Sequence, residues 1–294
     1  MPYGVDWVDA FTARPFAGNG CAVVYEATHL PVDTCTAFVR ETGLVECTFI
    51  GPSDKADLRV RYFLATREIP FAGHPTIATV ASLVDRGLAE PGALTIETGA
   101  GVISVDIGDD DRAPWITMTQ NRPEFGPQVP PDLVADIYGL GLDDIVGTPR
   151  MVSTGMPFCV TVLRDKEALA RARLDAHALE RFREAMAGPE SDVMEPYLVT
   201  LGGVTDAGDT FSRLLLAPPL PAEDPFTGSA TGSMAAYLWS EGLIEDASFT
   251  AEQGHWMGRP GQARVSRIGT AGDIAGVRVG GQGYVLMRGF LNLG

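Results

Sequence analysis

The chain has 294 residues, a length that suits one large domain or two of ordinary size, each able to bury a hydrophobic core. Hydrophobic residues make up 45% and charged residues 20%, a composition that excludes a largely disordered protein. The 38 acidic side chains outnumber the 22 basic ones and give a net charge of -16, so we expect neither nucleic acid nor an anionic membrane as a partner.

The sequence carries no sign of export or of a metal site. Its first residues, MPYGVDWVDAF, lack the basic stretch and apolar run of a signal peptide, and no apolar segment reaches the roughly 18 residues that span a bilayer. The four cysteines form no C-x-x-C pair; they are Cys21, Cys35, Cys47 and Cys159. We therefore expect a cytoplasmic protein with reduced thiols and no zinc or redox motif.

Short apolar runs rich in β-branched and aromatic residues predict strands along most of the chain. Two longer segments, Pro75–Arg86 and Ala230–Glu241, are apolar around most of their circumference, which predicts two buried helices. Gly87 and Gly242 follow them where a left-handed cap is favoured, and Pro75 suits a first helical position. The expected strands are 4–11, 22–25, 47–50, 59–64, 94–97, 102–107, 151–153, 158–163, 195–201, 213–216, 263–266, 277–279 and 283–290.

The sequence also repeats itself at an offset of 155 residues. The segment Glu68–Gly99 aligns without a gap on Glu223–Gly254, and 13 of the 32 aligned pairs are identical. Background identity of about 6% would give roughly two. We interpret the match as the duplication of a domain of about 150 residues; a shared short motif without duplication is the alternative.

The repeat predicts an α+β protein of two pseudo-symmetric lobes, each a barrel-like curled sheet around one central helix. The seam is expected at 120–132, which is rich in proline and polar residues. Accordingly, we expect an N-terminal lobe of residues 1–122 and a C-terminal lobe of residues 123–282. The last strand, about 283–294, is expected to return to the first lobe.

Each predicted helix is preceded by a glycine-containing turn, Ala72-Gly73-His74-Pro75 in one copy and Thr227-Gly228-Ser229-Ala230 in the other. Paired copies usually pack about a pseudo-twofold axis, which would bring these turns face to face. A helix N-terminus presents unpaired N–H groups and a positive dipole end, so it favours an anion. Two opposed N-termini are therefore suited to a carboxylate and to an oxygen that gains charge during reaction.

The two copies differ in polar residues at these turns. Ile69 corresponds to Asp224, and His74 corresponds to Ser229. His74 is interpreted as a proton carrier or hydrogen-bond donor, or else as an ordinary turn histidine. Asp224 is suited to anchoring an amine or hydroxyl, or else is a turn acid. Ser229 is suited to binding an acid group, or else is an N-cap.

At these residues the sequence resembles the PhzF-like isomerases of the diaminopimelate epimerase superfamily. Six segments, in the family's order, carry the resemblance over nearly the whole chain. They are Val8–Thr12, Gly18–Val24, Glu46–Ile50, Phe71–Pro75, Glu223–Ala230 and Gln253–Pro260.

The resemblance implies two lobes with the site between them, and an isomerase without a metal or organic cofactor. The family's namesake acts on trans-2,3-dihydro-3-hydroxyanthranilate, so a small carboxylate is the implied substrate, and a homodimer is the implied assembly. By the matching motifs, Glu46 is the implied acid/base catalyst. The other implied site residues are His74 and Asp224 as catalytic partners, and Gly73, Gly228, Ser229 and Asn19 as substrate-binding residues.

The residues alone leave the role of Glu46 open. It lies in the otherwise apolar run 43–50, either as a solvated strand end or as a buried acid whose pKa burial would raise. Two residues depart from the family pattern: Gly20 stands for the usual proline and is expected to loosen a turn, while Phe226 stands for alanine and is expected in the core. Glu195 is the expected counterpart of Glu46, with a structural role.

Two other functions are compatible with this pattern. The first is an amino-acid racemase or epimerase of the same superfamily, whose two catalytic thiols would stand at the positions of Ala72 and Thr227, where neither residue can act as a base. The second is a non-catalytic small-molecule-binding protein. Phosphate binding is disfavoured, since Gly18-Asn19-Gly20 lacks the Gly-x-Gly-x-x-Gly spacing and the chain has no Gly-Lys-Ser/Thr.

Overall fold

The computed structural model of the protein describes residues 2–109, 113–186, 195–218 and 220–293. The chain divides into two compact units. Unit 1 comprises the described parts of 1–119, 256–261 and 280–294, and unit 2 comprises those of 120–255 and 262–279. The predicted last strand extends to residue 294, which lies outside the described residues.

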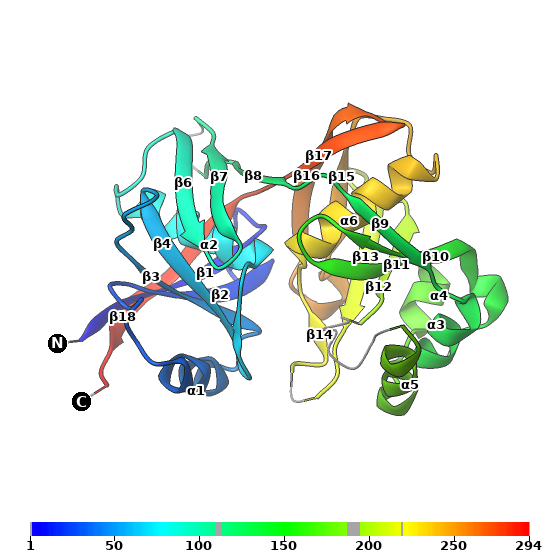
Figure 1. The fold of residues 1–294 in the computed structure, drawn as a ribbon, viewed down its shortest axis with the longest axis horizontal. Helices are drawn as coiled ribbons and strands as arrows, with labels where there is room; N and C mark the ends of the chain where they lie inside the picture. The colour runs from blue at the N-terminus through cyan, green and yellow to red at the C-terminus, as the bar shows by residue number, and fades with distance from the viewer. Residues whose placement is uncertain (1, 110–112, 187–194, 219, 294) are drawn as a thin grey trace. The chain divides into compact units, whose positions relative to one another are not determined.

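Unit 1 is one curled sheet (Figure 1). Its strands pair in the order β18-β1-β2-β3-β4-β6-β7-β8, and the two-residue β5 pairs with β4. The β2–β3 and β4–β6 pairs are parallel and the others are antiparallel. The strands are β1 (Tyr3–Ala10), β2 (Asn19–Val24), β3 (Glu46–Gly51), β4 (Leu58–Leu64), β5 (Glu68–Ile69), β6 (Gly92–Thr98), β7 (Gly101–Ile107), β8 (Ile116–Gln120) and β18 (Gly283–Leu291).

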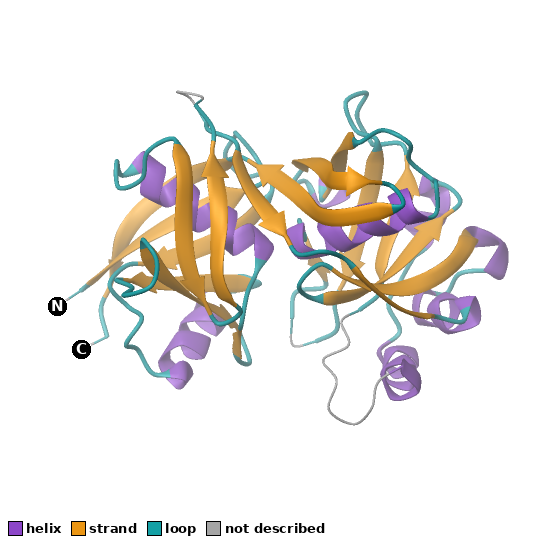
Figure 2. Cartoon of the chain, turned by 45° about the horizontal axis from the view of Figure 1, so that its top comes forward, coloured by secondary structure: helices purple, strands orange, loops and turns teal. Residues whose placement is uncertain are grey.

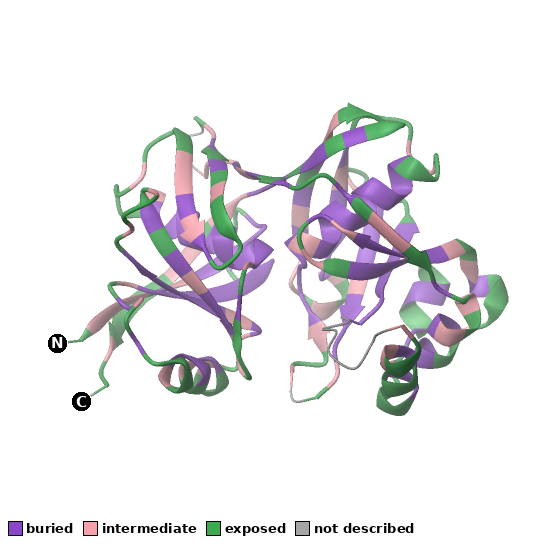
Figure 3. Cartoon of the chain, in the orientation of Figure 1, coloured by how far each residue is buried: buried purple, intermediate pink, exposed green. Residues whose placement is uncertain are grey.

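Helix α2 (Gly73–Asp85) lies inside this sheet, with strands around it (Figure 2). Every residue from Gly73 to Leu83 is buried, as Figure 3 shows, because apolar and small side chains cover all sides of the helix. The helix begins two residues before Pro75, earlier than predicted. Gly87 has a φ of +67°, which confirms the predicted left-handed cap.

Unit 2 repeats this order of pairing. Strands β9 to β13 pair consecutively, β13 also pairs with β15, and the short β14 pairs with β13. The β11–β12 and β13–β15 pairs are parallel, as are their counterparts in unit 1. The strands are β9 (Glu124–Gln128), β10 (Ile145–Ser153), β11 (Pro157–Leu163), β12 (Tyr197–Leu201), β13 (Thr210–Leu215), β14 (Glu223–Asp224), β15 (Ser248–Gln253), β16 (Gly261–Thr270) and β17 (Asp273–Gly281).

Helix α6 (Gly228–Ser240) is the buried helix of unit 2 and ends, like α2, before a glycine with φ +67°, Gly242. Three further helices pack beside the strands of this unit: α3 (Pro131–Tyr138), α4 (Lys166–Arg171) and α5 (Ala176–Met186). The segment 120–132, predicted as the seam, starts where unit 2 begins and contains β9 and the start of α3.

From the sequence the two buried helices were predicted, but α3, α4, α5 and α1 (Val32–Thr42) were not: α1, α4 and α5 mix charged and apolar residues, and α3 has only eight residues. Two short 3₁₀ turns, Leu142–Asp144 and His255–Met257, complete the elements. Within the described part of the chain, no helix combines the length and apolar character needed to cross a membrane.

An arginine–glutamate ion pair stabilises the strands that precede each buried helix. In unit 1, Arg61 on β4 donates Nε and Nη2 to the carboxylate of Glu68 on β5, at 2.8 and 2.7 Å. In unit 2, Arg213 on β13 does the same to Glu223 on β14, at 2.9 and 2.7 Å. These equivalent bidentate pairs fix the short strands from which the turns before α2 and α6 begin.

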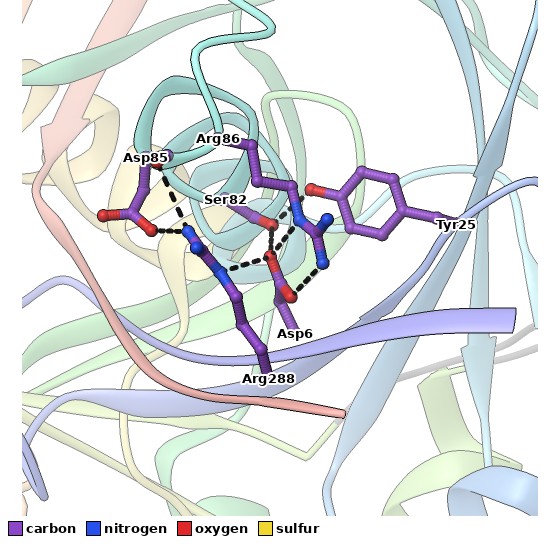
Figure 4. A network of polar contacts seen from close by, with 6 residues as sticks. All are labelled: Asp6, Tyr25, Ser82, Asp85, Arg86 and Arg288. Carbon is purple, nitrogen blue, oxygen red and sulfur yellow. Dashed lines mark hydrogen bonds and ion pairs between the residues drawn. The ribbon is translucent and has the colours of Figure 1, made fainter. Parts of the chain in front are cut away.

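A polar network holds the C-terminal end of α2 (Figure 4). The fully buried Asp6 carboxylate accepts two hydrogen bonds from Arg86, at 2.6 and 2.7 Å, and one from Ser82 at 2.7 Å. Burial alone would raise the pKa of Asp6, but these donors outweigh it and the pKa lies below its ordinary value. The network anchors α2 at the end opposite to its glycine-containing turn. Its residues are Asp6, Tyr25, Ser82, Asp85, Arg86 and Arg288.

Candidate active site

Glu46 and His74 lie side by side in unit 1. Glu46 is the first residue of β3, and its side chain keeps 15% of its exposure, so it is neither a solvated strand end nor a completely buried acid. His74 is the second residue of α2 and is buried. The carboxyl oxygen Oε2 of Glu46 lies 3.6 Å from Nδ1 of His74. The structure therefore brings these two predicted site residues together.

The His74 ring is neutral and its tautomer follows from its neighbour. Burial lowers the pKa of His74 to about 3, so the contact with Glu46 is not an ion pair at neutral pH. The side-chain amide nitrogen of Asn19 lies 3.1 Å from Nδ1. Since an amide nitrogen only donates, Nδ1 accepts and the ring proton is on Nε2.

The Nε2–H group of His74 is buried and has no hydrogen-bond partner among the described residues. A buried donor without a partner costs about 1 to 3 kcal/mol, so such groups are uncommon unless a ligand pairs with them. The ring is therefore prepared to donate one hydrogen bond to an acceptor on a bound molecule.

Asn19 was predicted to bind substrate, and the structure gives its amide a partner within the protein. The side chain is 2% exposed and is directed to His74. The turn before it depends on Gly18, which has a φ of +55° and no room for a Cβ, since that atom would lie 2.0 Å from the carbonyl oxygen of Ala10. Gly20 does not loosen this turn, contrary to expectation, because it lies within β2 and pairs with Asp9.

An ion pair between the buried Asp9 and the partly exposed Arg259, which was not predicted from the sequence, holds the same turn. Asp9 accepts from Nη2 of Arg259 at 2.6 Å and from the backbone N–H of Phe16 at 2.8 Å. Arg259 also donates to the carbonyl oxygens of Ala17 and Gly18, at 3.0 and 2.8 Å. The only sign of Arg259 in the sequence was its place in the segment Gln253–Pro260, which carries part of the family resemblance.

The two buried helices begin without a side-chain cap. The residues before them, Ala72 and Thr227, make no side-chain hydrogen bond to the first turn. Gly73 and Gly228 are the first residues of α2 and α6, and both are buried. Uncapped N–H groups at a helix start are suited to an anionic oxygen, and in unit 1 the unpaired Nε2–H of His74 lies in the same turn.

Asp224 is the polar centre of the corresponding turn in unit 2. It lies on β14, is 4% exposed, and its Oδ2 accepts from the hydroxyl of Thr227 at 2.6 Å. Ser229 is the second residue of α6 and is half-buried. It is not the N-cap, which is Thr227, so that interpretation of Ser229 was wrong.

A glutamine for which no role was predicted from the sequence stabilises this turn by hydrogen bonds. Gln253 at the end of β15 is fully buried and bonds to Asp224, Thr227 and Tyr197. Phe226 in the same turn is also fully buried, as expected for a core residue. Both polar and apolar contacts therefore hold this turn in place.

Glu195 occupies the register position of Glu46. In β3, Phe49 pairs with Arg61, and Glu46 lies three residues before Phe49. Likewise, Leu198 in β12 pairs with Arg213, and Glu195 lies three residues before Leu198. The adjoining Val193 and Met194 of the predicted motif lie outside the described residues.

The surroundings of Glu195 are those of a structural residue. Its Oε1 accepts from Nη2 of Arg183 and from the backbone N–H of Ala217, both at 3.1 Å, and the residue is 2% exposed. The Glu195 carboxylate is therefore paired with an internal cation.

The thiols are poor bases. Burial raises the pKa of Cys35 to about 11, that of Cys47 and Cys159 to about 12, and that of Cys21 far above its ordinary value. All four are therefore protonated at neutral pH. Among the described residues, no group of three or more His, Cys, Asp or Glu side chains is placed to hold a metal ion.

Comparison with known proteins identifies relatives along the whole chain. Residues 8–289 match the family model described as phenazine biosynthesis-like protein. An uncharacterized isomerase of Bacillus subtilis, YfhB, is 30% identical over 90% of this chain and 91% of its own length. The trans-2,3-dihydro-3-hydroxyanthranilate isomerase of Pseudomonas fluorescens is 27% identical over 97% of this chain and 98% of its own length.

A solved structure confirms the predicted fold. The chain matches a PhzF-family phenazine biosynthesis protein of Bacillus anthracis with a TM-score of 0.87 and 24% identity, and all of each chain is covered. The mixed α+β fold of the diaminopimelate epimerase type, expected from the resemblance, is therefore correct.

Proposed function

Because the chain belongs to the phenazine biosynthesis-like family, whose curated relatives are isomerases, we propose that it moves a proton between two carbons of a small carboxylate substrate. We propose further that the reaction needs no metal or organic cofactor. One observation carries the proposal: the carboxyl of Glu46 lies 3.6 Å from a buried, neutral imidazole whose Nε2–H is unpaired.

In this proposal Glu46 removes a proton from one carbon of the substrate and returns it to another on the same face. A carboxyl group partly shielded from water is suited to both steps. His74 donates its Nε2–H to a substrate oxygen, where negative charge develops when the proton leaves. The backbone N–H of Gly73 supplies a second donor at the start of α2.

In this proposal residues of unit 2 also bind polar groups of a substrate. Asp224 accepts a hydrogen bond from an amine or hydroxyl, and the Ser229 hydroxyl and the Gly228 N–H bind an acid group. The overall charge of -16 opposes an anionic substrate, so capture depends on these local donors.

We propose that the two units arose by duplication, in accord with the lobes expected at 1–122 and 123–282. The shared order of strand pairing and the equivalent Arg61–Glu68 and Arg213–Glu223 pairs support this origin. A homodimer remains the state expected by resemblance, and a cytoplasmic location remains the expectation from the cysteine pattern.

Racemisation with two thiols is disfavoured by the residues before the helices. Ala72 and Thr227 stand where the two thiols of such racemases are expected, and all four cysteines are buried and protonated. A single carboxyl group can transfer a proton on one face of a substrate but cannot by itself exchange it between opposite faces.

The relative from Pseudomonas fluorescens suggests the first substrate to test. The protein would be incubated in D₂O with trans-2,3-dihydro-3-hydroxyanthranilate and, in parallel, with L-proline and trans-4-hydroxy-L-proline, and followed by proton NMR. We expect isomerisation of the cyclic dihydro acid and no exchange at the α-carbon of either amino acid. Exchange at an α-carbon with inversion would indicate an epimerase, and no reaction with any substrate would favour a binding protein.

A further inference from the structure

Three positions at which unit 2 differs from unit 1 are joined by hydrogen bonds. In the repeat, Asp224 replaces Ile69, Thr227 replaces Ala72 and Gln253 replaces Thr98. The Thr227 hydroxyl donates to Asp224 Oδ2 at 2.6 Å, and Gln253 Nε2 lies 3.2 Å from the same hydroxyl oxygen. The polar differences therefore form one connected group.

The side-chain amide of Gln253 has all its hydrogen-bonding groups in use. Its Oε1 accepts from the backbone N–H of Thr227 at 3.0 Å and from the Tyr197 hydroxyl at 2.8 Å. Its Nε2 donates to the carbonyl oxygen of Asp224 at 2.8 Å and to the Thr227 hydroxyl. A backbone N–H can only donate, so the orientation of the amide is fixed.

This orientation determines the direction of the next hydrogen bond. Because Gln253 Nε2 donates to the Thr227 oxygen, the hydroxyl proton of Thr227 is free to point at Asp224. The Tyr197 hydroxyl donates to Gln253 Oε1, and burial raises the pKa of Tyr197 to about 12. The hydrogen bonds donated by Gln253 Nε2 and by the Thr227 hydroxyl thus end on Thr227 or Asp224, whereas the Thr227 N–H and the Tyr197 hydroxyl donate to Gln253 Oε1.

We propose that Gln253 is a positioning residue for the isomerase reaction, which holds the Thr227 hydroxyl as a donor to Asp224 and fixes this carboxylate as an acceptor for the substrate. The inference rests on the proposed role of Asp224 in substrate binding. In unit 1 the equivalent turn has no carboxylate, and there the Thr98 hydroxyl donates to the carbonyl oxygen of Gly101 and accepts from the N–H of Ala100.

The test uses the full chain and trans-2,3-dihydro-3-hydroxyanthranilate as substrate. Gln253→Leu and Thr227→Val remove the positioning amide and the donor, while Thr227→Ser keeps the hydroxyl. We expect kcat/KM to fall at least about tenfold in Gln253→Leu and Thr227→Val, mainly through a higher KM, and to stay within about threefold of wild type in Thr227→Ser. Thr98→Val is the matched control in unit 1 and should leave both constants unchanged.

The double variant Gln253→Leu/Thr227→Val separates positioning from general destabilisation. If both residues act through one hydrogen bond, the double variant should lose little more than the worse single variant, since coupled residues are not additive. Multiplied losses, or equal losses in Thr227→Ser and Thr227→Val, would contradict the proposal. Tyr197→Phe, which removes one donor to Gln253 but keeps the ring, should show a smaller loss in the same direction.

A measurement without substrate tests the positioning role of Gln253 independently of the proposed isomerase function. Hydrogen exchange of the Thr227 amide, which donates to Gln253 Oε1, should become at least about tenfold faster in Gln253→Leu and remain unchanged in Thr98→Val. Unchanged exchange at Thr227 would overturn the positioning role. If exchange responds as expected but wild type does not convert the dihydro acid, the choice of substrate is wrong and the positioning role stands.

Discussion

Glu46 and Glu195 occupy the same register position in the two units but have opposite surroundings. Glu195 is held by the guanidinium of Arg183 and a backbone N–H, so its charge is used within the protein. Glu46 instead faces a neutral imidazole, that of His74, which is oriented by Asn19. Glu195 is thus held by an internal cation, whereas Glu46 lies beside a neutral ring with an unpaired Nε2–H, and we propose that this difference suits Glu46 to carry a proton.

The first prediction concerns the charge of His74. Because burial lowers its pKa to about 3, from an ordinary value near 6.5, the folded ring stays neutral over the physiological range. The Cε1–H signal of His74, assigned by its loss in His74→Gln, should not move in a proton NMR titration from pH 8 to about 4.5. A titration midpoint near 6.5 would contradict the burial of the ring.

The same depressed pKa makes the stability of the protein depend on pH. Below about pH 6.5 the unfolded chain binds a proton at His74 that the folded chain does not, so acid favours unfolding. Wild type should therefore lose stability faster than His74→Gln as the pH falls from 7 to 5, by about 2 kcal/mol. Denaturant unfolding at both pH values measures the difference, and parallel curves for the two proteins would refute the prediction.

Asp6 should contribute stability in a different pH window. Its pKa lies below the ordinary value, so its contribution is present above about pH 4 and is lost as the pH falls through the folded pKa. Asp6→Asn should cost about 2 to 3 kcal/mol at pH 7, because it leaves Arg86 without its buried partner. Thermal unfolding monitors this loss, while kcat of the folded variant should change little because the network lies at the far end of α2.

Removal of metal ions should not affect the reaction. The proposed mechanism assigns every proton transfer and every charge to side chains and backbone groups of the chain itself. Dialysis against EDTA should leave the rate of isomerisation unchanged, with a metal-dependent enzyme treated in parallel as a positive control. A rate that falls on chelation and returns on addition of a divalent cation would require a metal in the mechanism.

The buried framework could be predicted from the sequence because its signals are local. The 3.6-residue pattern and the following glycines located α2 and α6, and short apolar runs located most strands. The helices α1, α4 and α5 were missed because they mix charged and apolar residues, and α3 was missed because its eight residues are too few for a clear helical period.

The candidate site was only partly predictable, for a physical reason. Turn residues such as His74 and Asp224 stand out as polar differences between the copies, whereas Glu46 was indicated only by family resemblance. Gln253 and Arg259 were missed because they act through hydrogen bonds to residues distant in sequence. No local pattern records which turn a buried amide or guanidinium will contact.

The most direct test compares the two equivalent carboxyl groups. Wild type, Glu46→Gln and Glu195→Gln would be incubated with trans-2,3-dihydro-3-hydroxyanthranilate in D₂O, and turnover and deuterium incorporation followed by proton NMR. Glu46→Gln should lose about a thousandfold in kcat with its fold intact, whereas Glu195→Gln should lower the melting temperature and keep kcat within about threefold. Turnover that survives in Glu46→Gln, or that is lost equally in both folded variants, would contradict Glu46 as the proton carrier.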